Sequence, residues 1–141
     1  MEAPRRTHSP AKAEYAGLPL VYSCSGCSDA AQLANTLAVR LDREKRAEMS
    51  CIAGVGGGVR SLVKTACAGR PILALDGCPL HCVRHCLEQV GVRATVHVDL
   101  SRAGVKKRLH ADAAPEEVER VWQGVILPAL ARVRALAATG A

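Results

Sequence analysis

Aromatic residues are almost missing from this chain of 141 residues, which has no Phe, two Tyr and one Trp. Its hydrophobic fraction is nevertheless 49%, so the core must be built from Leu, Val, Ile and Ala, which suits packed α/β layers. The formal charge of +6 would favour binding to an acidic partner if the basic residues were clustered. The dense basic patch is confined to Arg102, Lys106, Lys107 and Arg108. Because rings for base stacking are scarce, we expect a solvated basic surface and no nucleic-acid binding.

Residues 1–16 contain no apolar run of the length that a signal peptide needs, and we find no later stretch suited to crossing a bilayer. We therefore expect a cytoplasmic protein with no membrane insertion. In that reducing compartment, the seven cysteines are not expected to form a disulfide framework. Metal ligands, redox thiols and core residues are the roles that remain.

The length fits one domain. Residues 1–16 combine prolines, charges and small residues without periodicity, which is typical of a disordered tail. Residues 17–141 then form a single domain.

Strands and helices are expected to alternate along that domain. Buried strands are predicted at 18–23, 71–75 and 94–100, and helices at 28–41, 59–69, 79–91 and 112–133, with a kink or break at Pro128. Segment 49–53 is either a fourth strand or a loop. This alternation predicts a small three-layer α/β domain, with a mostly parallel sheet of three to four strands and flanking helices.

The cysteines concentrate where predicted strands end. Cys24 and Cys27 follow the first strand, Cys51 precedes the glycine run 54–58, and Cys78 follows the strand 71–75. The carboxyl ends of parallel strands share one edge of a sheet, where loops form a crevice. We expect these sulfurs to meet there.

Cys78, Cys82 and Cys86 are spaced four residues apart, which would place them along one side of a helix beginning near Pro79. A helix N-terminus favours thiolate over thiol. Four thiolates would bind a soft cation such as Zn²⁺ in tetrahedral geometry. Cys27 and Cys86 are secondary candidates.

Other residues near these cysteines have simpler interpretations. Cys67 is expected to be a buried structural residue away from the site, and His81 to be a surface residue rotated away from it. His85 is a weak candidate for an outer contact to the site, and Asp76 should accept amide hydrogen bonds in its turn. The glycine run lacks the lysine and hydroxyl of a phosphate loop and should let the backbone turn behind Cys51.

Three blocks carry a family resemblance: Cys24-Ser-Gly26, Cys51-Ile-Ala-Gly-Val-Gly-Gly57 and Asp76-Gly-Cys-Pro-Leu-His-Cys82. In this order and spacing they resemble the DGC domain family of bacterial and archaeal proteins, to which zinc binding is ascribed, over about residues 18–92. The resemblance implies a metal site of four cysteines, Cys24, Cys51, Cys78 and Cys82. It implies no catalytic residue.

Three functions are compatible with these cysteines. The first is a zinc-binding domain in which the thiolates hold the fold or present the metal to a partner. The second is a thiol redox or sulfur-transfer protein using Cys24 with Cys27 or Cys78 with Cys82. The third is an iron–sulfur protein, although the spacings differ from common ferredoxin patterns. The implied partner is a protein or a small thiol or sulfur compound, and the sequence assigns no oligomeric state.

Overall fold

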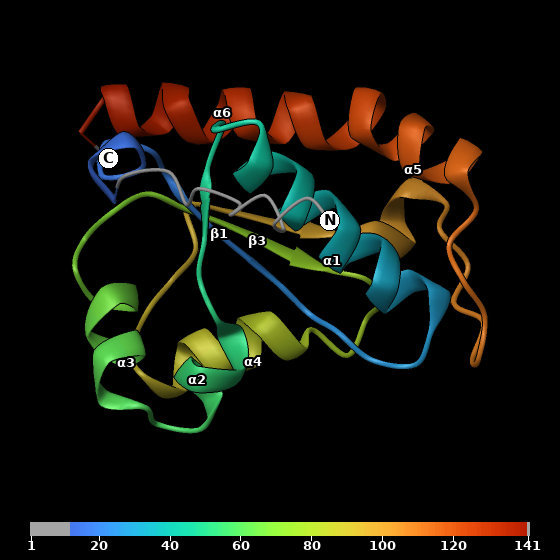
Figure 1. Cartoon of the computed structure of the whole chain (residues 1–141), viewed down its shortest axis with the longest axis horizontal. Coiled ribbons are helices and arrows are strands. Elements are labelled where there is room, and N and C mark those ends of the chain that lie inside the picture. The colour runs from blue at the N-terminus through green and yellow to red at the C-terminus, as the bar shows by residue number, and fades with distance from the viewer. Residues whose placement is uncertain (1–11, 141) are drawn as a thin grey trace, which may run out of the picture.

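The computed structural model describes residues 12–140, which form a four-stranded sheet with helices on both faces (Figure 1). All strand pairs are parallel, in the order β2-β1-β3-β4. The strands are β1 (Leu20–Ser23), β2 (Glu48–Met49), β3 (Ile72–Asp76) and β4 (Val96–Asp99). The expected α/β class and parallel sheet are therefore confirmed, and segment 49–53 supplies one residue to a two-residue edge strand.

The helices lie between and after these strands. They are η1 (Lys12–Glu14), α1 (Asp29–Arg43), α2 (Ile52–Gly56), α3 (Arg60–Ala66), α4 (Cys82–Gln89), η2 (Leu100–Ala103), α5 (Pro115–Val121), the π-helical turn η3 (Trp122–Ile126) and α6 (Leu127–Ala138). In Figure 1, α1, α5 and α6 lie on one side of the sheet and α2, α3 and α4 lie on the other. The molecule thus has three layers.

The register of the sheet brings all four strand ends to one edge. Leu20 pairs with both Glu48 and Ile72, and Asp76 at the end of β3 pairs with Asp99 at the end of β4. β1 and β3 are buried along their whole length, as expected for continuous apolar runs in a parallel sheet. The segments that follow the strands therefore begin side by side.

α1 shows why these helices pack as they do. The hydroxyl of Ser28 accepts a hydrogen bond from the Ala31 amide and so caps the helix. The apolar side chains recur at three- and four-residue steps and are buried against the sheet: Ala30, Leu33, Ala34, Leu37, Ala38 and Leu41. On the same face of the sheet the single Trp, Trp122, is buried, with the Arg40 guanidinium 4.1 Å from its ring centre.

The C-terminal helical segment runs from Pro115 to Ala138 without the break that Pro128 predicted. Proline lacks the amide that would bond to the carbonyl of Gly124, and the chain instead widens into the π-helical turn η3 just before it. By length and composition alone this segment could cross a membrane, contrary to our expectation for the sequence. Its inner face, including Trp122, Ile126 and Val133, is buried within the domain.

Part of the expected N-terminal tail packs on the domain. Residues 1–11 lie outside the described residues, but Lys12–Glu14 form η1. Tyr15 is buried, and its hydroxyl donates a hydrogen bond to the Asp42 carbonyl. The Arg70 side chain donates to the Tyr15 carbonyl at 3.0 Å. Residues 12–16 therefore belong to the folded unit.

Candidate thiol and metal site

Cys24 lies at the point where the two central strands end. Its amide donates to the carbonyl of Leu75, continuing the ladder between β1 and β3 for one residue. Its Sγ accepts a hydrogen bond from the Gly77 amide at 3.2 Å, and the side chain is buried. Burial raises the pKa of the Cys24 thiol to about 11, although the Gly77 hydrogen bond opposes the shift. Cys24 is thus the inner member of the cysteine set.

Cys51 follows the edge strand β2 and serves as the N-cap of α2. Its Sγ accepts from the Gly54 amide at 3.4 Å, and the side chain is exposed. The glycine run that was expected to turn the backbone behind Cys51 is helical in its first part, and the turn comes at its end, where Gly58 has a φ of 72°. A Cβ at Gly54 would lie 1.9 Å from Cδ1 of Leu62, so any other residue would require the Leu62 side chain to move. Cys51 is therefore held by a helix N-terminus.

The four-residue spacing predicted that Cys78, Cys82 and Cys86 share one helix, but Cys78 lies outside it. α4 begins at Cys82, because His81 has a left-handed φ of 53° and so cannot continue a right-handed helix. Cys78 is half-buried in the preceding loop, and Cys82 is exposed in the first turn of the helix. The prediction therefore holds for the last two cysteines alone.

Cys86 lies one turn further along α4, against α2. A Cβ at Gly56 would be 2.9 Å from the Cys86 Sγ, so the two helices approach closely at this point. Burial raises the pKa of the Cys86 thiol, and the negative charges of Cys82 and Asp76 act in the same direction. Cys86 therefore lies where α4, whose first turn carries Cys82, packs against α2, whose N-cap is Cys51.

A lysine that the sequence analysis did not assign to the site contacts Cys78. The Lys107 ammonium donates to the Cys78 Sγ at 3.6 Å. The segment that carries it crosses the start of α1, where the Arg108 amide donates to the Asp29 carboxylate at 2.7 Å. This segment also passes Cys27, which is exposed and whose carbonyl accepts from the His110 amide. Two residues of the dense basic patch, Lys107 and Arg108, therefore lie at the cysteine edge.

Two acid–histidine pairs lie beside the loop that carries Cys78. Asp76 is 1% exposed and accepts hydrogen bonds from the amides of Val83 and Arg84, which confirms the expected amide contacts. Its Oδ2 is also 2.8 Å from Nε2 of His97. The His81 Nε2 lies 2.8 Å from Oδ2 of Asp99.

His81 is therefore not the free surface residue that we expected, because its left-handed backbone turns the ring toward β4. Burial alone would raise the pKa of the Asp99 carboxyl. Hydrogen bonds from the Ser101 hydroxyl, His81 and the Ser101 amide outweigh burial and lower that pKa. His85, the weak candidate for an outer contact, has a side chain that is 70% exposed and lies 3.8 Å from Glu88.

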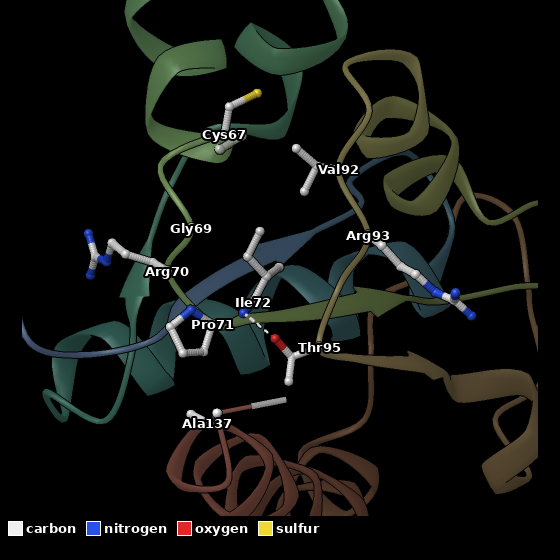
Figure 2. A pocket seen from close by; sticks show the side chains of 11 residues that line it. Cys67, Gly69, Arg70, Pro71, Ile72, Val92, Arg93, Thr95 and Ala137 are labelled. Carbon is white, nitrogen blue, oxygen red and sulfur yellow. Dashed lines mark hydrogen bonds between the residues drawn. The ribbon is translucent and has the colours of Figure 1, made fainter.

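Cys67 is exposed, so the expectation that it is a buried structural residue is wrong. It ends α3, and its thiol lies 3.7 Å from the Val90 carbonyl. Figure 2 shows it on the wall of a pocket formed around the beginning of β3, with Ile72 and Val92 nearby. This pocket lies at the amino ends of β3 and β4, at the opposite edge of the sheet from Cys24.

The four principal cysteines come from loops at one edge, but they do not form a finished coordination shell. Among residues 12–140, no three His, Cys, Asp or Glu side chains lie close enough together to hold a metal ion. Negative charge on Asp76, Cys82 and Cys78 nevertheless raises the pKa of Cys24 further, so these groups are electrostatically coupled. The donors suit a soft cation, and side-chain rotation would have to complete the geometry.

The comparisons with known proteins agree with this arrangement of motifs. The profile of the DGC domain matches residues 20–125, and the chain belongs to that family. It is 62% identical over 105 residues to the anaerobic and virulence modulator AnvM of Pseudomonas aeruginosa, an alignment that covers 74% of this chain and 80% of that protein. No solved structure matches the chain.

Proposed function

We propose that this protein binds one thiophilic metal ion, Zn²⁺ foremost, through Cys24, Cys51, Cys78 and Cys82. The observation that carries the proposal is the placement of these cysteines at one edge of the parallel sheet, where Cys24 follows β1, Cys51 follows β2, and Cys78 and Cys82 follow β3. Nearby Asp76, Cys82 and Cys78 also raise the pKa of the Cys24 thiol, in addition to burial. Several acidic groups there oppose one another's ionisation. A bound divalent cation would offset the repulsion between their negative charges and would bind the cysteines as thiolates.

The preference for zinc follows from the donors. Thiolate sulfur is a soft ligand, and four sulfurs near 2.3 Å from the ion make the closed tetrahedral shell of a structural zinc site. Cys24 and Cys51 already accept hydrogen bonds from the amides of Gly77 and Gly54. Such amide donors support the negative sulfur. We propose that the ion ties together the loops after β1, β2 and β3.

A modulating role fits this site better than catalysis. The support for this role is that the relative from Pseudomonas aeruginosa is named a modulator. We propose that this chain acts in the cytoplasm by presenting its thiol or metal edge to a protein or to a small sulfur compound. Lys107 and its basic neighbours would then face that partner.

A thiol redox or sulfur-transfer function is the second candidate, and the contact between Lys107 and Cys78 favours it. A cationic neighbour at 3.6 Å from a half-buried sulfur is a feature of reactive cysteines. The redox and metal functions use the same sulfurs but differ in what the purified protein contains.

Metal analysis with a visible spectrum separates the candidates. We expect about one zinc per chain and no visible absorption; a coloured protein with iron and sulfide would instead indicate a cluster. Substitution with Co²⁺ should give an intense thiolate-to-cobalt charge-transfer band. That band should weaken in Cys24→Ser, Cys51→Ser, Cys78→Ser and Cys82→Ser.

Cys67→Ala is the matched control, because Cys67 lies at the other edge of the sheet (Figure 2). It should retain the metal content and the cobalt spectrum of the wild type. Loss of metal from a folded Cys67→Ala protein would show that the ligand set is misassigned. A wild-type protein that binds neither Zn²⁺ nor Co²⁺ would reject the metal function and favour the redox one.

A further inference from the structure

The loop from Gly77 to His81 is anchored at both ends by acid and histidine side chains, and not by its cysteines. At its start, Asp76 is bonded to the amides of Val83 and Arg84 in the first turn of α4 and to His97 of β4. At its end, His81 is bonded to Asp99, also of β4. Cys78 lies between these anchors, and Cys82 follows them directly.

The two pairs also contact each other. The rings of His81 and His97 are 4.8 Å apart between centroids and meet edge to face at 81°. Asp99 accepts two further hydrogen bonds from Ser101, through its amide at 2.9 Å and its hydroxyl at 2.5 Å. Each member therefore has its position fixed by at least one neighbour from another element.

His81 pays a conformational cost for this contact. Its φ of 53° lies in the left-handed region, which is strained for a residue with a Cβ. That backbone turns the ring toward Asp99 and starts α4 at Cys82. Glycine would adopt this backbone without strain, but it could not make the bond to Asp99 that the His81 side chain makes.

We propose that Asp76, His81, His97 and Asp99 form an acid–histidine clamp that positions Cys78 and Cys82 for ligand binding. This inference rests on the proposed metal function. Its members are positioning residues: they act by holding the loop, and none needs to touch the ion. By analogy with residues that orient metal ligands from outside the coordination shell, breaking one clamp contact should weaken metal affinity about 10-fold or more.

Two variants alter the contact between His81 and Asp99 in different ways. Asp99→Asn removes the carboxylate charge and presents an NH₂ group that can donate only to an unprotonated Nε2 of His81, while its oxygen can still accept from Ser101. His81→Gly removes the ring but tolerates the positive φ. His85→Ala is the matched control, because His85 is an exposed histidine on the same helix and outside the clamp.

Competition with a chromophoric chelator measures the Zn²⁺ affinity, and iodoacetamide labelling with mass spectrometry measures the reactivity of Cys78 in the metal-free protein. We expect both clamp variants to bind Zn²⁺ about 10-fold more weakly or worse and to label Cys78 faster. Cys67 in the same samples should label at the wild-type rate. His85→Ala should match the wild type throughout.

The outcomes separate the clamp from the metal function. Wild-type affinity in both variants would overturn the clamp and leave the metal function standing, even if their melting temperatures fell. A wild type that binds no Zn²⁺ would reject the metal function. The clamp would then be judged by Cys78 labelling alone, and an unchanged rate in both variants would overturn it too.

Discussion

At Cys24, burial and neighbouring negative charge both raise the pKa of the thiol. Burial is the larger cause of its raised pKa, and Asp76, Cys82 and Cys78 add to it, while the Gly77 amide opposes it. A motif search finds this cysteine but not its environment, because the neighbours come from segments about 50 residues away in the chain. The consequence is a thiol that stays protonated in the folded protein unless a cation replaces the proton.

The first prediction concerns the alkaline stability of the metal-free protein. The folded pKa of Cys24 is raised from 9.0 to about 11, so the unfolded chain loses this proton first as the pH rises. Stability is then unaffected below about pH 9 and falls between pH 9 and 11, by on the order of 2 kcal/mol from this group. Urea unfolding with a chelator present should show a shallower loss over that range in Cys24→Ser. Equal slopes in the two proteins would contradict the assignment.

The second prediction tests the close approach beside Cys24. A Cβ at Gly77 would lie 2.5 Å from the carbonyl oxygen of Ala30, a backbone atom of α1 that cannot rotate away. Gly77→Ala should therefore destabilise the protein by about 1–3 kcal/mol or more. Gly26→Ala is the control, because its Cβ would meet Ala31 at an ordinary 3.7 Å. We expect the control to be within about 0.5 kcal/mol of the wild type, by urea unfolding; similar losses in both would refute the clash.

At the scale of elements, the strands and most helices follow from the order of the residues. The apolar run of β3 is buried as a central strand, and the periodic apolar residues of α1 are buried along one face of a helix. Sequence patterns therefore predict both elements. The start of α4 was misplaced because Pro79 offered a conventional first turn. In the structure, Asp76 and His81 determine that start through contacts with β4, which local patterns do not contain. The expected placement of Cys78 on that helix was wrong for the same reason.

The third prediction concerns the π-helical turn η3. Gly124 lies in its middle, and a Cβ there would meet no atom within 4 Å. Gly124→Ala should stabilise the protein by roughly 0.5–1 kcal/mol, because alanine loses less backbone entropy on entering a helix. Thermal unfolding measures the change. A loss of stability would show that the wide turn itself requires glycine.

Gly91→Ala is the control for that variant. Its Cβ would also meet open space, but its φ is 74°, where alanine is strained. It should lose roughly 1 kcal/mol. Opposite signs for the two variants would show that backbone conformation, and not packing, decides the outcome.

At the scale of the whole molecule, most of the hydrophobic core lies away from the cysteine edge, and Cys24 is the cysteine that belongs to it. The largest buried side chains include Leu33, Leu37, Leu73 and Trp122, and they lie within the sheet and its two helical layers. The cysteines other than Cys24 are half-buried or exposed. Metal at the edge would therefore add to a fold that already has its own core.

The fourth prediction follows for removal of metal. Chelation of the zinc-loaded protein should lower the melting temperature without unfolding the domain, by on the order of 4 °C for each kcal/mol of lost stabilisation. Hydrogen exchange should increase first in residues 51–58 and remain slow in β1 and β3. An unchanged melting temperature together with unchanged protection of 51–58 would mean that the cysteines act as free thiols.

The parallel order β2-β1-β3-β4 also has a kinetic consequence. β1 is the first strand to be synthesised, but its partners are β2, which begins at Glu48, and β3, which begins at Ile72. β4 is synthesised last. Every strand contact is therefore distant in the chain, and such pairings form slowly. During synthesis, Cys24 leaves the ribosome long before the β3 segment that must lie beside it. The cysteine edge therefore cannot form before β3 has been synthesised and paired with β1, so an ion that binds all four sulfurs would meet central strands that are already in place.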